Sequence, residues 1–301
     1  MRKRTLLLAS CALALFAGAE AFARFGLGLG TPPLSVTHPT IEYMFAPDQD
    51  VRRFGNRLLY NELGMRSPRL DAVAASRRVL VIGDSVVNGG SLTDHAALAT
   101  TLLSDDNVFF GNVSAGSWGP ANMGAWLEEF GAQGADTAVI VLSSHDYGDI
   151  PNFEPLDPNT HPTSSPVLAV HELVTRYLPR FLPAFGTMPV SEEEREPELP
   201  EAGRKGLHRL LDALAEGGLK ACLIQHLTET ELSSAPERAW AATGEIFQAR
   251  GYPIVQLSHR IAREHAAGRR LYRDDIHLND LGQVALAEAI RECDSQAKRE
   301  G

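Results

Sequence analysis

The sequence predicts an α/β fold in which helices cover both faces of a parallel sheet of five strands. Two observations predict it. From residue 77 onward, short apolar runs alternate with stretches whose apolar residues recur at helical spacing. The apolar runs lack the polar alternation of a strand with one wet face, so they suit strands buried on both sides. Strands that alternate with helices in this way pair in parallel.

The clearest of the five expected strands is residues 138–142, where every residue is apolar. In chain order the strands cover residues 79–82, 108–113, 138–142, 221–227 and 253–257. Helices are predicted over residues 92–103, 122–130, 201–216, 232–250 and 280–297. The helix at 201–216 ends at the pair Gly217-Gly218, a helix stop. In such sheets the functional site lies beyond the carboxyl ends of the strands.

Two segments lie outside this alternation. Residues 24–75 are predicted to be an N-terminal extension or linker that packs on the main domain, residues 76–301. An insertion at about 147–200 is rich in proline and follows the third strand. Because it begins beside candidate catalytic groups, two interpretations stay open, a lid over the site and a surface loop without a role.

Residues 1–23 are predicted to be a targeting segment. Basic residues at 2–4 precede an apolar stretch, and Ala21-Phe22-Ala23 offers a small-x-small cleavage site. Cleavage after Ala23 would release a periplasmic or secreted protein. Retention would leave residues 5–23 as a single anchor in the inner membrane, just long enough to span it, although Glu20 weighs against this alternative.

Composition excludes some classes of function. The net charge of −10 argues against binding to nucleic acid or to an anionic membrane surface. No cysteine and histidine spacing is typical of a zinc site, so we expect no metal and no organic cofactor. Cys222 and Cys293 are either two buried thiols or a disulfide, and the sequence leaves both open.

Two motifs carry candidate chemistry. The first strand runs into Gly-Asp-Ser at 83–85, which would expose the hydroxyl of Ser85 at the sheet edge. That hydroxyl needs a nearby base to act as a nucleophile. Far downstream, Asp-Asp-Ile-His at 274–277 places His277 one turn after Asp274, which can accept the imidazole Nδ1–H. Each motif alone also fits helix capping, but together they predict a Ser-His-Asp triad.

The order and spacing of these motifs resemble those of the SGNH (GDSL) hydrolase superfamily. In that family the Asp-x-x-His motif also runs into a polar residue, a glycine and the C-terminal helix. The resemblance covers about residues 77–297 and implies a flavodoxin-like, three-layer α/β/α fold with serine hydrolase activity. It also implies that the backbone N–H groups of Ser85 and Gly116 form an oxyanion hole.

The chain departs from the family after the third strand, where Gly-x-Asn-Asp is usual and this chain has Ser-Ser-His-Asp at 143–146. His145 stands in place of the asparagine, and an imidazole can also donate to an oxyanion. Three further residues are candidates for contact with substrate. Trp118 would stack on a sugar, and Asp146 and His226 would line the site from the strand ends.

These features predict an exported serine esterase that acts on small-acyl esters, most simply O-acetyl esters of a polysaccharide. Exported members with an N-terminal anchor resemble bacterial enzymes that remove or transfer acetyl groups on polysaccharides. Two alternatives stay open. A polysaccharide O-acetyltransferase would use the same acyl-enzyme, and a catalytically weak sugar-binding or assembly protein would explain the substitution at His145.

Overall fold

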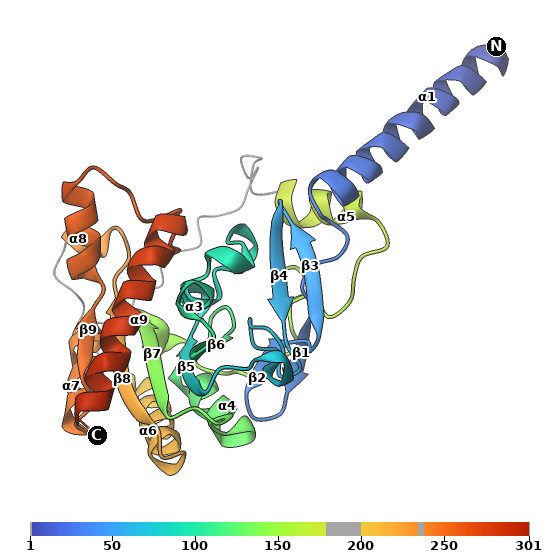
Figure 1. The fold of residues 1–301 in the computed structure, drawn as a ribbon. Helices are drawn as coiled ribbons and strands as arrows, with labels where there is room; N and C mark the ends of the chain where they lie inside the picture. Colours follow the sequence, from blue (N-terminus) through green and yellow to red (C-terminus); the bar gives the residue numbers. More distant parts are fainter. Residues whose placement is uncertain (1, 179–199, 234–237, 301) are drawn as a thin grey trace.

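The computed structural model describes residues 2–178, 200–233 and 238–300, and a five-stranded parallel sheet forms its centre (Figure 1). The strands are β5 (Arg77–Gly83), β6 (Val108–Ser114), β7 (Thr137–Ser143), β8 (Lys220–His226) and β9 (Ile254–Gln256). They lie in the order β6-β5-β7-β8-β9, the strand order of flavodoxin-like sheets. The predicted fold class is confirmed.

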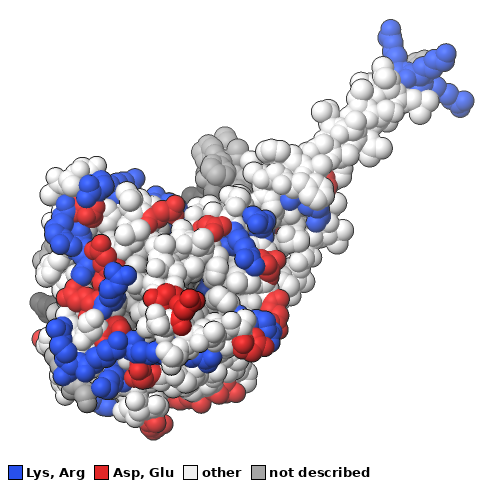
Figure 2. Space-filling view, viewed as in Figure 1, with Lys and Arg blue, Asp and Glu red and all other residues white. Residues whose placement is uncertain are grey.

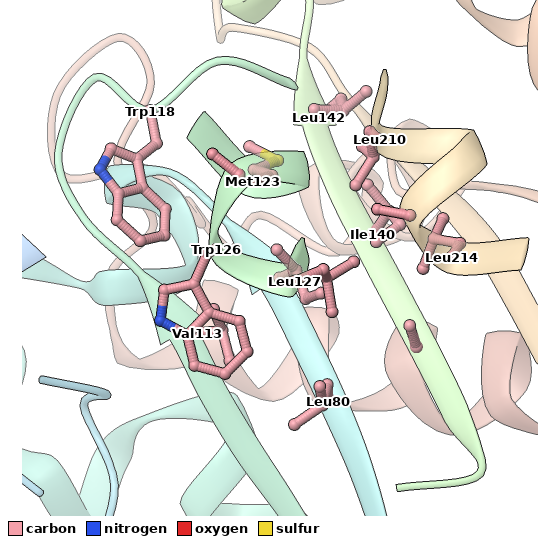
Figure 3. Packing of buried hydrophobic residues seen from close by; sticks show 14 of the residues in the cluster. Leu80, Val113, Trp118, Met123, Trp126, Leu127, Ile140, Leu142, Leu210 and Leu214 are labelled. Atoms are coloured by element: carbon pink, nitrogen blue, oxygen red, sulfur yellow. The ribbon is translucent and has the colours of Figure 1, made fainter. Parts of the chain in front are cut away.

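Helices cover both faces of this sheet. One layer contains α4 (Pro120–Phe130), α6 (Glu201–Glu216) and α7 (Arg238–Ala249). The other contains α2 (Ser85–Asn88), α3 (Ala99–Leu103), α8 (Ser258–Ala266) and α9 (Asp280–Glu300). Leu80 and Ile82 of β5 pack in the first layer, while Val79 and Val81 pack in the second. This alternation follows from the period of two along a strand. Figure 3 shows residues of the first layer, with Leu80 and Trp126 among them.

The predicted helix at 92–103 is wrong over its first half. The chain instead forms two 3₁₀ turns, Gly90–Leu92 and His95–Ala97, and the α-helix begins only at Ala99. The reason is Asp94, whose side chain accepts hydrogen bonds from the backbone of Ala96 and Arg57. The sequence analysis also missed α8, which is short and strongly charged.

Residues 24–75 form two antiparallel hairpins beside the sheet. They are β1 (Ser35–His38) with β2 (Glu42–Phe45), and β3 (Gln49–Arg53) with β4 (Asn56–Tyr60). Tyr43 and Met44 of β2 join the apolar core of the first layer. The extension therefore shares a core with the main domain.

The described part of the insertion packs on this extension. The ring of His161 lies 4.2 Å from that of Tyr43, measured between centroids. Glu172, in the short helix α5 (Ala169–Glu172), forms a buried ion pair with Arg53 of β3. Residues 179–199 lie outside the described residues, and the lid interpretation stays a prediction.

At the N-terminus, α1 (Arg2–Ala21) projects from the domain, and the π-helical turn η1 (Phe22–Gly26) joins it to the domain (Figure 1). By length and apolar composition this is a candidate membrane span, with a mean hydropathy of 1.9. Signal sequences have the same length and composition, so these properties do not separate the two outcomes.

Cys222 and Cys293 form a disulfide between β8 and α9. Both side chains are fully buried between the sheet and its last helix. Of the two alternatives that the sequence left open, the structure has the disulfide.

Candidate active site

Ser85, His277 and Asp274 meet at the carboxyl edge of the sheet. The hydroxyl of Ser85 lies 3.0 Å from Nε2 of His277. Nδ1 of the same imidazole lies 2.9 Å from Oδ2 of Asp274. In the tautomer that satisfies both contacts, Nδ1–H donates to Asp274 and Nε2 accepts from Ser85. The structure thus brings together three residues that span almost 200 positions of the sequence.

The turn that presents Ser85 requires Gly83. A Cβ at this position would lie 2.5 Å from Val87, because α2 folds back directly over the end of β5. Asp84 then caps α2 by accepting the N–H of Val86 at 2.9 Å. Asp84 is buried, whereas Ser85 is partly exposed. The capping role that the sequence allowed for both residues belongs to Asp84, so the hydroxyl of Ser85 is left to face His277.

Asp274 holds His277 through side chain and backbone. Its Oδ1 accepts the backbone N–H groups of His277 at 2.7 Å and of Ile276 at 3.1 Å. Partial burial acts to raise the pKa of Asp274, but these N–H groups and the imidazole outweigh it and lower the pKa. The carboxylate therefore stays charged at neutral pH, as is needed to stabilise an imidazolium.

A second loop, after β8, fixes the turn that carries His277. Thr230 donates to Oδ1 of Asp275 through its backbone N–H at 3.0 Å and its hydroxyl at 2.7 Å. Glu229 donates its backbone N–H to the carbonyl of Asp275 at 2.7 Å. Asp275 is thus bound by this loop, whereas Asp274 binds the imidazole. We name Glu229, Thr230 and Asp275 the loop clasp. Glu229 is a candidate from the sequence, because it follows the fourth predicted strand, whereas Thr230 had no signal there.

Two predicted oxyanion donors lie at the ends of the strands beside β5. Gly83 pairs with Ser114 of β6, so Ser85 and Gly116 each follow this pair by two residues. A Cβ at Gly116 would meet no atom within 4 Å, so its backbone borders open space. His145 follows β7, and its side chain is 29% exposed. It lies near the turn at Ser85, because one of its ring nitrogens lies within 4.8 Å of a carboxylate oxygen of Asp84.

Asp84, His145 and Asp146 offer ligand atoms that lie within 4.8 Å of one another. Burial, and next the negative charge of Asp84, raise the pKa of Asp146 well above its usual value. Both carboxylates also accept hydrogen bonds. Asp84 accepts the N–H of Val86 and, at 3.3 Å, the hydroxyl of Ser85, and Asp146 accepts the N–H of Ser143.

Three predicted substrate contacts need correction, because the structure buries all three side chains. Trp118 is 2% exposed, and its indole N–H donates to the carbonyl of Tyr43, so no face is open to a sugar. Asp146 is fully buried and accepts the N–H of Ser143. His226 is fully buried too, with Nε2 at 3.0 Å from the carbonyl of Ile276. Burial lowers the pKa of His226, so the ring is neutral and supports the turn that carries His277.

Arg66 was missed by the sequence analysis. It is fully buried, and its guanidinium donates to the carbonyls of Asn88 and Thr93 at 2.7 and 2.6 Å. Asn88 is the last residue of α2, and Thr93 lies in the segment that follows it. Arg66 thus connects the N-terminal extension to the element that carries Ser85. An isolated arginine in a loop gives no sequence signal of such a contact.

No protein-family model and no curated protein matches the sequence. Solved structures do resemble it, among them GDSL hydrolases and esterases. A lipolytic protein of the G-D-S-L family from Veillonella parvula is 12% identical, with 72% of this chain and 97% of that chain covered and a TM-score of 0.44. A mutant of Axe2, an acetyl-xylooligosaccharide esterase from Geobacillus stearmophilus, is 15% identical, with coverages of 73% and 95% and a TM-score of 0.45. These likenesses concern the overall fold alone.

Proposed function

We propose that the protein is an exported serine esterase with Ser85 as nucleophile, His277 as general base and Asp274 as the residue that orients the base. One observation carries the proposal, the continuous chain of hydrogen bonds from Ser85 through His277 to Asp274. Nucleophile, base and orienting carboxylate in contact are the parts that acyl transfer to a serine needs.

In the proposed reaction the Oγ of Ser85 attacks the ester carbonyl while its proton passes to Nε2 of His277. The resulting oxyanion receives hydrogen bonds from the N–H groups of Ser85 and Gly116, with His145 as a further donor. The bond to the alcohol then breaks, and His277 returns the proton to the leaving oxygen. Water repeats these steps on the acyl-enzyme and releases the acid.

We propose small-acyl esters, and O-acetyl groups of a polysaccharide in particular, as the substrate class. Ser85 and His277 are only partly buried, and polar or small residues follow the neighbouring strands, Gly116 and His145 among them. A hollow of about 540 Å³ lies elsewhere, lined by residues 158–159 and 162–168 of the insertion and by part of α5 and η6 (Leu173–Tyr177). An exposed hydroxyl in a polar setting suits a short acyl group on a large, hydrated alcohol.

The proposed export has two independent supports. The helix α1 has the length and composition of a signal sequence or anchor. The disulfide between Cys222 and Cys293 is of a kind that persists in oxidising compartments such as the periplasm.

The test is hydrolysis of p-nitrophenyl acetate by the full chain beside the Ser85→Ala variant. We expect turnover in the parent and its loss in the variant, with unchanged far-UV circular dichroism. Equal turnover in both would refute the assignment of Ser85. Acyl length and acetylated oligosaccharides follow, and faster hydrolysis of long-chain esters would overturn the small-acyl proposal.

Two further measurements on the same pair of proteins distinguish the two alternatives. Acetyl groups that appear on an added oligosaccharide would identify a transferase. Glycan binding that survives Ser85→Ala, without turnover in the folded parent, would identify a binding protein.

A further inference from the structure

The C-terminal end of α1 is joined to the folded domain by specific contacts. Glu20 accepts the N–H groups of Ala169 and Val170, at the start of α5, at 3.0 and 2.9 Å. Its carboxylate also pairs with Arg24 at 2.7 Å, and Arg24 donates to the carbonyl of Val167 at 2.8 Å. Glu20 therefore caps a helix of the insertion, 149 residues away.

The expected cleavage position lies inside this junction. Ala23 is fully buried in a small apolar cluster with Leu29 and Ala169. Its carbonyl accepts the N–H of Leu29 at 2.9 Å. Removal of residues 1–23 would leave the start of α5 without its cap and this cluster without Ala23. A leader that is discarded needs no such partners, so these contacts favour retention.

Large apolar side chains surround the junction on its solvent side. We name six of them the apolar collar: Phe22, Phe25, Val167, Leu168, Val174 and Leu178. Phe25 and Val167 are 84% and 89% exposed. Two collar residues belong to η1, two directly precede α5, one lies in η6 and one directly follows it. Other residues of these three elements pack in the cluster around Ala23. Clustered exposed apolar side chains mark an interaction surface.

The length of α1 identifies what covers the collar. Between Arg2 and Glu20 the helix rises about 27 Å, close to the roughly 30 Å of the hydrocarbon core of a bilayer. If the basic residues 2–4 stay at the cytoplasmic surface, Glu20 and the collar reach the opposite interface. Figure 2 shows the basic tip of α1 and the uncharged shaft that separates it from the domain.

We propose that residues 1–23 are retained and that the apolar collar enters the outer interface of the membrane that α1 spans. The domain is then held against the bilayer at a fixed face, with Glu20 and Arg24 paired at the boundary. The collar carries apolar contacts and needs no anionic lipid, in keeping with the net charge of −10. The proposal rests on the proposed export but not on the esterase activity.

The first test is the intact mass and N-terminal sequence of the full chain extracted from membranes of the expressing cells. We expect a chain that begins at residue 1 or 2. A chain that begins at Arg24 would overturn the proposal.

The second test measures insertion of the collar. An environment-sensitive nitrobenzoxadiazole label is placed on Val167→Cys in a Cys11→Ser background, in vesicles of phosphatidylcholine. The control is Val284→Cys on α9, a site that is 46% exposed and outside the collar. We expect lipids with nitroxide-labelled acyl chains to quench the label at position 167 several-fold more than that at position 284. Equal quenching would overturn the docked collar.

Hydrolysis of p-nitrophenyl acetate by the same vesicles is measured separately. Absence of turnover would refute the esterase and leave the quenching result valid. Strong turnover with equal quenching would refute the collar and leave the esterase standing.

Discussion

Asp274 binds its turn at three points, the imidazole and backbone N–H of His277 and the backbone N–H of Ile276. Replacement by asparagine keeps an oxygen for the backbone but lets an amide N–H face the imidazole, which favours the wrong tautomer. We expect Asp274→Asn to lower kcat for p-nitrophenyl acetate by about 10³–10⁴-fold. Thermal unfolding is the control, since the fold should persist. Unchanged turnover would remove Asp274 from the proposed triad.

Variants of His145 test whether this residue donates a hydrogen bond to the oxyanion. If it donates to the oxyanion, His145→Ala should lower kcat by about 10²-fold with little change in KM. The matched variant His145→Asn supplies an amide donor and should restore much of the loss. The outcome that speaks against this role is equal kcat in the parent and in His145→Ala.

The raised pKa of Asp146 leads us to expect that the stability of the fold depends on pH. Burial and the charge of Asp84 raise its pKa in the fold above the ordinary value of 3.8. Between these two values the native state binds the proton more strongly than the unfolded chain does, so this group's contribution to stability falls as pH rises. Asp146→Asn removes the titration and keeps an acceptor for Ser143. We expect its stability relative to the parent to increase with pH, in urea unfolding from about pH 4 to about pH 8. A constant difference would show that Asp146 does not titrate as described.

Among the elements, the loop clasp and the turn at 274–277 act together. The hydroxyl of Thr230 binds Asp275, the neighbour of Asp274, so the clasp helps to fix the position of His277. This arrangement complements the turn at Gly83, which sets the position of Ser85. Proper alignment of Ser85 and His277 therefore depends on two loops that follow different strands.

Thr230→Val removes this hydroxyl at nearly constant shape. We expect a loss of about 1 kcal/mol in unfolding free energy and a fall of several-fold in kcat, with KM nearly unchanged. The control is Thr175→Val on η6, whose hydroxyl donates to the carbonyl of His171 and should affect stability only. A fall in stability without any change in kcat would give Thr230 a structural role alone.

At the scale of the whole molecule, the disulfide joins the sheet to the last helix across 71 residues of sequence. A crosslink over a loop of this length restricts the unfolded chain strongly. We expect the double variant Cys222→Ala and Cys293→Ala to lose about 2–4 kcal/mol of unfolding free energy. Chemical unfolding of the parent with and without reductant checks the same value. Identical midpoints would show that the bond contributes nothing.

The sequence by itself determined the layered α/β fold and the approximate positions of its strands. Apolar periodicity is a local property, and the helix at 201–216 ends where its glycines predict. It also identified Ser85, Asp274 and His277 as triad candidates, because Gly-Asp-Ser ends the first strand and Asp-x-x-His places a carboxylate one turn before a histidine. The failure at 92–103 has a non-local cause, since Asp94 also binds the backbone of β4.

Only the tertiary structure decided which side chains are buried. Trp118 is covered because the carbonyl of Tyr43, 75 residues away, accepts its N–H. Arg66 and the loop clasp have roles only through partners from other elements, and Glu20, which read as an obstacle to a membrane anchor, is the cap of α5. The sequence shows which residues can bind or react, and packing between distant segments decides which of them are exposed and which are held in place.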